Sequence, residues 1–283
     1  MTKMKVGLVG CGNIGADLCI FLQKGSVPAE IAALHDINEE RANLLKRSFH
    51  LDAPVCSLEE AAERSHFLVE CAVAEAVKPV IEAAIRYHRD CLIMSVSGLM
   101  AHPELLEEAK EHNIQVRIPS GAICGLDGIR AAMEAGLHSV LLVTRKPPKG
   151  LMGAPYLQEH EIRIDNLTEP MIVFEGTALD AARAFPANVN VAGALSLAGI
   201  GPKETRVRII ADPKATENIH EIHAEGAFGR MQTVTVNLPS PRNPKSSYLA
   251  SLSACAELRA AAQAFLTYCT YCEDKVKRHR GPQ

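Results

Sequence analysis

The chain has 283 residues, a formal net charge of −3 and a hydrophobic fraction of 47% that includes only 4% aromatic residues. This length predicts two domains with ample apolar sequence for a core. The lack of a global basic field argues against nucleic acid as the main partner, and no apolar run approaches the roughly 20 residues that span a bilayer. A strand occupies the N-terminus, so we expect no signal peptide, no membrane partner and a cytoplasmic protein.

The first predicted element is a short apolar strand, residues 6–9, that runs into a G-x-G-x-x-G pattern. Its three glycines are Gly10, Gly12 and Gly15. In such a pattern the first glycine makes a tight turn, the second lets the backbone approach a pyrophosphate, and the third lets the next helix pack on the strand. That helix begins at Asn13 and Ile14, whose backbone N–H groups would face the phosphates. The pattern predicts a dinucleotide-binding unit.

The second predicted strand, residues 30–36, ends in an acid about 20 residues past the last glycine. A carboxylate at this place, Asp36, would accept a hydrogen bond from the ribose 2′-hydroxyl, which favours NAD. Arg41 and Lys46 follow closely, and such cations suit a 2′-phosphate. NADP therefore remains an alternative cofactor.

Strand and helix patterns then alternate as far as residue 118, which predicts an α/β fold with a Rossmann-type, doubly wound parallel sheet. The expected helices cover residues 38–49, 74–87 and 103–112, with a capping-box start at Ser57, and the expected strands cover residues 67–71, 90–96 and 114–118. Ligands of such sheets bind outside the carboxyl ends of the strands. We therefore expect the cofactor at that edge.

A second domain is expected where this alternation stops, with the boundary between residues 120 and 121. Its strand patterns lie at residues 139–144, 171–174, 206–211, 218–224 and 232–238. They predict an α+β domain with an open, mainly antiparallel sheet and helices on one side. Residues 121–243 would form this substrate and dimerisation domain, and a long helix within residues 244–283 would complete the domain of residues 1–120. The segment 146–155 is expected to be a loop.

The nine cysteines are scattered and show no repeated C-x-x-C pairs of the kind that bind zinc, so we expect no metal site. Cys269 and Cys272 form one such pair, late in a helical pattern. There we interpret them as ordinary helix residues.

Histidine is the natural candidate for proton transfer near neutral pH. Most of the eleven histidines lie at polar, helix-end or terminal positions, and His35 adjoins Asp36. His220 and His223 lie among charged residues on one expected strand, where a spacing of three puts them on opposite faces. The residues alone leave both open as candidates.

Six motifs together closely resemble the L-aspartate dehydrogenase family. They are VGLVGCGNIG near the N-terminus, PSGAICGLD from Pro119, FEGT from Phe174, FPANVNVA from Phe185, ENIHEI from Glu217 and NPKSSYL from Asn243. The first motif is shared by many dehydrogenases, whereas the blocks at residues 120–123, 185–192 and 217–222 are far more specific. The resemblance covers most of the chain.

This resemblance implies an NAD(P)-dependent enzyme that oxidatively deaminates L-aspartate to iminoaspartate. The product would hydrolyse to oxaloacetate and ammonia or supply NAD biosynthesis, and the enzyme would be a homodimer. Carried over by motif, His220 is the catalytic histidine, and Ala122 and Asn190 contact the cofactor. The segment 146–161 looks longer than the family pattern, as does the C-terminal helix.

The substrate carboxylates require fixed cations. Lys245 is the favoured candidate, with Ser246 beside it, because both precede the N-terminus of the last helix. Arg145 and Lys203 are the alternatives. If His220 accepts the proton, the rate of deamination should increase with pH through a pKa of roughly 6 to 7. This pKa would be higher if Glu217 or Glu221 stabilises the charged imidazole.

Two other functions are compatible with a glycine motif of this kind. One is a different two-domain oxidoreductase, such as a sugar dehydrogenase or a dihydrodipicolinate-type reductase. The former relatives carry an E-K-P lysine where this chain has Ser95 to Gly98, and the latter carry adjacent histidines, which are absent here. The other is a non-catalytic NAD(P)-sensing module, which would need no histidine in its second domain.

Overall fold

The computed structural model describes residues 3–186, 189–243 and 246–279, with side chains up to residue 268. Within these ranges the chain forms two compact units. The first is drawn from Met1–Met94, Glu104–Arg117 and Ala254–Gln283, and the second from Ser95–Pro103 and Ile118–Ser253. Residues 95–103 and 246–253 thus fall in the second unit, whereas the expected domain boundaries put them in the first.

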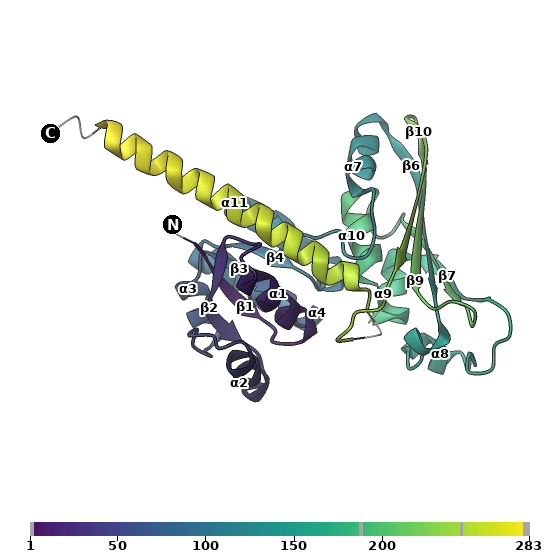
Figure 1. Cartoon of the computed structure of the whole chain (residues 1–283). Helices are drawn as coiled ribbons and strands as arrows, with labels where there is room; N and C mark the ends of the chain where they lie inside the picture. Colours follow the sequence, from purple (N-terminus) through teal and green to yellow (C-terminus); the bar gives the residue numbers. More distant parts are fainter. Residues whose placement is uncertain (1–2, 187–188, 244–245, 280–283) are drawn as a thin grey trace. The chain divides into compact units, whose positions relative to one another are not determined.

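The first unit is a five-stranded parallel sheet in the order β2-β1-β3-β4-β5 (Figure 1). Its strands are β1 (Met4–Val9), β2 (Ala29–His35), β3 (Phe67–Glu70), β4 (Asp90–Ile93) and β5 (Val116–Arg117). Its helices are α1 (Asn13–Gln23), α2 (Glu39–Ser48), α3 (Leu58–Arg64), α4 (Ala74–Tyr87), α6 (Glu104–Glu111) and α11 (Tyr248–His279), the last of which begins in the second unit.

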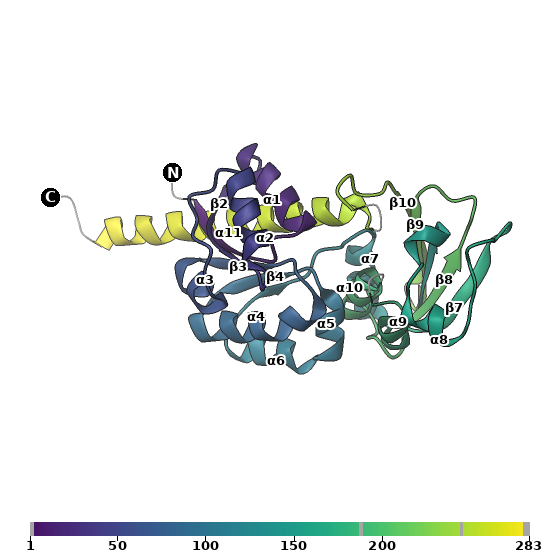
Figure 2. The same ribbon diagram turned by 90° about the horizontal axis from the view of Figure 1, so that it is seen from below.

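Helices cover both faces of this sheet, as Figure 2 shows. Side chains of α1, α2 and α11 share one apolar cluster with the strands, while α3 and α4 contact the strands from the other face. The four residues of β3 are all buried, as expected for a parallel strand that is covered twice. This arrangement confirms the predicted Rossmann-type, doubly wound sheet.

The second unit is an open five-stranded sheet in the order β10-β9-β6-β8-β7. Its strands are β6 (Leu137–Lys146), β7 (Met171–Thr177), β8 (Arg206–Ala211), β9 (Asn218–Gly226) and β10 (Gly229–Asn237). Its helices are α5 (Val96–Ala101), α7 (Leu126–Ala135), α8 (Pro155–Glu159), α9 (Ala178–Ala184) and α10 (Asn190–Ala198), with a short 3₁₀ helix η1 (Pro148–Gly150). Every strand pair is antiparallel except β6 with β8, so the sheet is mixed and mostly antiparallel, close to the prediction.

The two faces of the second sheet differ in burial. Along β9, alternate residues from Asn218 to Ala224 are buried. Along β10, the exposed residues also alternate, and the exposed side chains Val234 and Val236 lie on the opposite side of the sheet from these buried ones. We call the buried side the inner face. Helices α7, α9 and α10 lie against it, and Leu195 and Phe185 are fully buried there (Figure 1).

Two local expectations were wrong. The strand expected to reach Val96 stops at Ile93, because the Glu70 carboxylate accepts the backbone N–H of Met94 at 3.1 Å and the chain then enters α5. Packing rather than helix propensity stabilises α5, since Val96 and Met100 press against Gly193 of α10. The expected loop at 146–155 contains η1 and runs into α8.

Among the described residues, no helix combines the length and the apolarity that crossing a bilayer requires.

Candidate active site

The glycine motif forms the turn between β1 and α1. Gly10 has a φ of +96°, and a Cβ there would lie 2.6 Å from the carbonyl carbon of Cys71. A Cβ on Gly15 would lie 2.7 Å from the carbonyl oxygen of Gly10. Around Gly12, in contrast, no heavy atom lies within 4 Å of the Cβ position. The first and third glycines are therefore required by the fold, while the second leaves open space beside the backbone.

This open space adjoins the N-terminus of α1. Gly12 is the N-cap residue and provides no side-chain acceptor for the N–H groups of the first turn, which begins with Asn13 and Ile14. Uncapped N–H groups and the helix dipole together favour an anion. The residues present thus fit the pyrophosphate of a dinucleotide.

The Asp36 carboxylate is fixed against the same turn. Its Oδ2 accepts the backbone N–H of Cys11 at 2.8 Å, and its Oδ1 accepts that of Asn38 at 2.9 Å. Because a carboxylate has about four acceptor positions, two further hydrogen bonds remain available to it. The carboxylate therefore lies beside the glycine turn with capacity to accept ribose hydroxyls.

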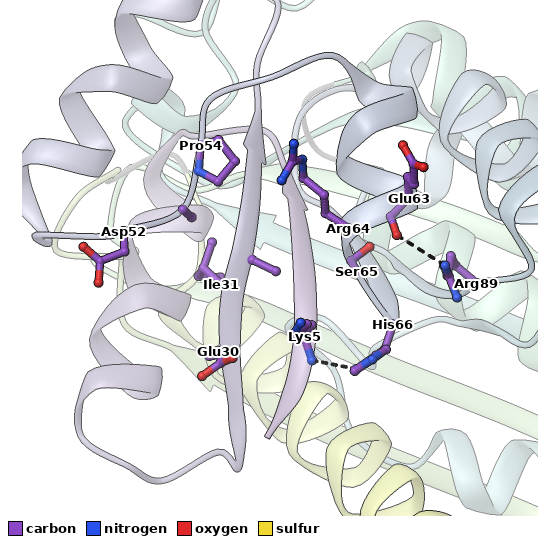
Figure 3. A pocket seen from close by; sticks show the side chains of 12 residues that line it. Lys5, Glu30, Ile31, Asp52, Pro54, Glu63, Arg64, Ser65, His66 and Arg89 are labelled. Carbon is purple, nitrogen blue, oxygen red and sulfur yellow. Dashed lines mark hydrogen bonds between the residues drawn. The ribbon is translucent and has the colours of Figure 1, made fainter. Parts of the chain in front are cut away.

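A hollow in the first unit lies instead at the amino ends of the strands, around Lys5 and Glu30 (Figure 3). Its side chains carry both signs of charge, and several serve the fold. Arg89 donates to the carbonyl oxygens of Ala62 and Glu63 at the end of α3, and His66 accepts the backbone N–H of Lys5. Ligands of parallel sheets bind at the opposite edge, so we assign this hollow no function.

The second unit carries a buried polar cluster at one end of its inner face. His220 of β9 is 2% exposed, and its Nδ1 lies 3.0 Å from the hydroxyl oxygen of Thr144 on the paired strand β6. On the other side of β9, Thr235 of β10 pairs with His220. The threonine contact engages Nδ1 in either tautomer, which leaves Nε2 as the ring nitrogen that can exchange a proton.

Ala122 belongs to the same cluster. Its carbonyl oxygen accepts hydrogen bonds from the Thr235 hydroxyl at 2.9 Å and from the Asn237 amide at 3.0 Å. Both donors lie on β10, and Thr235 also contacts the carbonyl oxygen of His220. Thr235 and Asn237 thus connect the backbone at Ala122 to β10, the strand that pairs with the strand of His220.

Asn190 begins α10, and its side chain is also fixed. Its Oδ1 accepts the backbone N–H of Ser97 at 3.2 Å. The next residue, Val191, lies 3.6 Å from the position that a Cβ on Gly121 would take. The structure therefore brings the segments of Ala122 and Asn190 together within the second unit.

A buried lysine completes the cluster. Lys146 ends β6 two residues after Thr144, so both side chains lie on the inner face, and it is 5% exposed. Burial lowers the pKa of its ammonium group to about 8. Its positive charge in turn acts on His220, so the two groups are close neighbours electrostatically.

The cations expected to bind substrate are placed differently. Lys245 lies outside the described residues, and the Ser246 hydroxyl donates to the carbonyl oxygen of Asn243 within its own turn. Arg145 pairs with Asp212 at 2.9 Å, and Lys203 is exposed. Of these candidates, none is seen to join the described side chains around His220.

The expected pKa of the histidine was wrong. Burial, and secondarily the charge of Lys146, lower the pKa of His220 to about 3 instead of leaving it at 6 to 7. The neighbouring glutamates do not counter this effect. Glu217 accepts a hydrogen bond from Thr216, and Glu221 lies with His223 on the opposite face, 3.5 Å from its Nε2. His220 is therefore neutral throughout the physiological range.

Two family profiles match the chain. Residues 10–119 match the profile described as the NAD binding domain of homoserine dehydrogenase, and residues 127–261 match the one described as the C-terminal part of aspartate dehydrogenase. The first match supports NAD or NADP as the cofactor.

Individual relatives agree over nearly the whole chain. The L-aspartate dehydrogenase of Methanosarcina mazei is 47% identical over 261 residues, which cover 90% of this chain and 96% of that protein. That of Bradyrhizobium diazoefficiens is 38% identical over 259 residues, 91% of each. This chain belongs to the L-aspartate dehydrogenase family. The crystal structure of the aspartate dehydrogenase from Thermotoga maritima has a TM-score of 0.69 at 25% identity and covers 92% of this chain and 97% of that one.

Membership of this family confirms the resemblance inferred from the motifs.

The sequence had not pointed to several residues of the cluster around His220, namely Thr144, Lys146, Asn218, Ser247, Thr235 and Asn237. One signal was present, because polar residues at alternate positions of β9, Asn218 and His220, interrupt a strand whose later inward residues are apolar. Asn218 donates to the Ser247 hydroxyl at 3.2 Å, so Ser247, rather than Ser246, contacts this strand.

The contrast between the glycines predicts a separable effect on cofactor binding. Gly12→Ala should leave the melting temperature unchanged, because the new methyl group meets no atom within 4 Å. It should weaken NADH binding, because that methyl group fills the space open to the pyrophosphate. Fluorescence titration with NADH and thermal melts measure the two effects. Gly25→Ala is a contrasting variant: Gly25 lies in open space but has a φ of +69°, so its replacement should lower the melting temperature and leave NADH affinity unchanged. Unchanged NADH affinity in Gly12→Ala would place the pyrophosphate elsewhere.

Proposed function

We propose that this protein is an L-aspartate dehydrogenase, which uses NAD or NADP to convert L-aspartate to iminoaspartate. The observation that carries the proposal is the buried His220 in a polar cluster at the end of an otherwise apolar sheet face. A buried titratable group with a strongly shifted pKa is a candidate for a functional site, and family membership supplies the reaction in which His220 would act. The imine would then hydrolyse to oxaloacetate and ammonia or enter NAD biosynthesis.

We infer that the glycine turn binds the cofactor, and the family motifs add Ala122 and Asn190 as cofactor contacts. Gly12 and the first turn of α1 would hold the pyrophosphate, and Asp36 would accept from the adenosine ribose. When bound, the nicotinamide supplies the acceptor for the hydride that leaves the substrate's α-carbon. Every other step falls to side chains of the protein.

We infer that His220 is the residue that accepts the proton released in the reaction. As a neutral imidazole it can accept a proton at Nε2 from the substrate's amino group, or from the water that attacks the imine. Thr144 holds Nδ1 and so orients the ring. Thr144 is a positioning residue in this scheme, because it acts through the histidine.

We also infer that the protein is a cytoplasmic homodimer that pairs through the outer face of the second sheet. Seven described cysteines are free thiols, which suits a reducing compartment. The outer face exposes large apolar side chains, with Val234 51%, Val236 62% and Ile172 50% exposed. Exposed apolar surface of this kind favours a protein partner, and a second copy is the partner expected from the family.

The role of Asp36 predicts cofactor preference. Asp36→Ser should shift the ratio of kcat/KM for NAD over NADP toward NADP by roughly 10- to 100-fold, because a carboxylate repels the 2′-phosphate and accepts from the 2′-hydroxyl. Initial rates with both cofactors measure the ratio, and Asp52→Ser, at an exposed aspartate of the same unit, is the control. If the ratio stays as in the wild type, Asp36 does not contact the ribose.

The role of His220 predicts a loss of turnover without a loss of cofactor. His220→Ala should lower kcat for L-aspartate by about 10² to 10⁴, the usual contribution of general acid–base catalysis, and leave the Kd for NADH unchanged. His223→Ala is the matched control, since this residue lies on the same strand but on the outer face. A larger loss in His223→Ala, or wild-type rates in His220→Ala, would overturn the assignment. A pure NAD(P)-sensing module would show no turnover even in the wild type.

A further inference from the structure

Lys146 is placed by the sheet, not by a loop. It is the last residue of β6, and its backbone carbonyl accepts the N–H of Asp212 at 2.9 Å, which extends the pairing with β8 to the end of the strand. The alternation along β6 therefore fixes the direction of its side chain toward the inner face, where Thr144 precedes it. Arg145 between them points to the other face and pairs with Asp212.

The 3₁₀ helix η1 lies over the methylene stem of this lysine. A Cβ on Gly150 would be 3.7 Å from Cβ and 3.6 Å from Cδ of Lys146, which is ordinary contact distance. The stem is thus enclosed between the sheet and η1, and a long flexible side chain is held in one direction. The first part of the segment 146–161, which looked longer than the family pattern, therefore packs on the side chain of Lys146.

The buried surroundings of Lys146 disfavour the charged form of its amino group. Burial lowers its pKa to about 8, so at neutral pH the group is mostly charged in a place that disfavours charge. The charge of Lys146 also disfavours protonation of His220. A cation in this position is useful to a ligand that brings negative charge, and the proposed substrate brings two carboxylates.

We propose that Lys146 is a specificity-determining residue whose ammonium group binds a carboxylate of the dicarboxylic substrate beside His220. The inference rests on the proposed function, since it assigns a residue to the substrate of that reaction. Binding of a carboxylate would compensate the positive charge that Lys146 places near the imidazole. Substrate recognition and the readiness of His220 to accept a proton would then depend on the same contact.

The test compares Lys146→Met with the wild type in the full-length protein. Lys146→Met should raise KM for L-aspartate by roughly 10- to 100-fold, the range expected for losing a hydrogen bond between charged groups. The Kd for succinate, a dicarboxylate without an amine, should rise by a similar factor in calorimetric titration of the NADH-bound protein. Lys146→Arg should recover part of the succinate affinity, because it keeps the charge. Lys149→Met, an exposed lysine of the same segment, is the control and should change neither quantity.

Thermal melts verify that each variant is folded at the temperature of the assays. Unchanged KM and unchanged succinate affinity in a folded Lys146→Met would overturn the inference. A fall in kcat with KM and succinate affinity unchanged would do so as well, since it would make Lys146 a proton-transfer group. If the wild type binds succinate but does not oxidise L-aspartate, the proposed function fails while the succinate measurement still decides the role of Lys146.

Discussion

The contact between the His220 imidazole and Thr144, in a register that also buries Lys146, is the constraint on which the rest of the site depends. Pairing of β6 with β9 sets the histidine opposite the threonine, and the period of two along β6 carries the lysine to the same face. A slip of one residue would turn all three outward. The second sheet thereby holds a neutral imidazole and an ammonium group out of water, and the helices on its inner face supply the apolar burial that stabilises it.

The first unit contributes a different kind of precision. There the backbone, not side chains, forms the anion site, and Gly10 and Gly15 allow the strand, turn and helix to approach more closely than any side chain would permit. Asp36 then joins the turn to the end of β2 through two backbone N–H groups. In the proposed function, cofactor recognition would depend on a rigid turn, whereas substrate chemistry would depend on the buried, titratable side chains His220 and Lys146, whose pKa values burial lowers.

Sequence patterns were sufficient for the parts of the molecule that local rules control. The glycine spacing, the alternation of strands and helices, the capping box at Ser57 and the opposite faces of His220 and His223 all follow from short-range geometry, and the structure shows each of them. Lys146 was missed because it was assigned to a loop, whereas strand pairing with β8 extends β6 through it. The helix α5 was missed because Val96 and Gly98 favour other conformations and are held helical by α10. The pKa of His220 could not be foreseen either, because desolvation depends on the complete fold.

The most direct test of this account is the ionisation of His220, measured by ¹H–¹⁵N NMR of histidine-labelled protein with His220→Ala to assign the signal. We expect the ring of the ligand-free protein to be still neutral at about pH 5, since burial and Lys146 lower the pKa of His220 to about 3. A ring that titrates at about 6.5, as a solvent-exposed histidine does, would contradict the claim that a buried imidazole beside a buried ammonium forms the centre of this site.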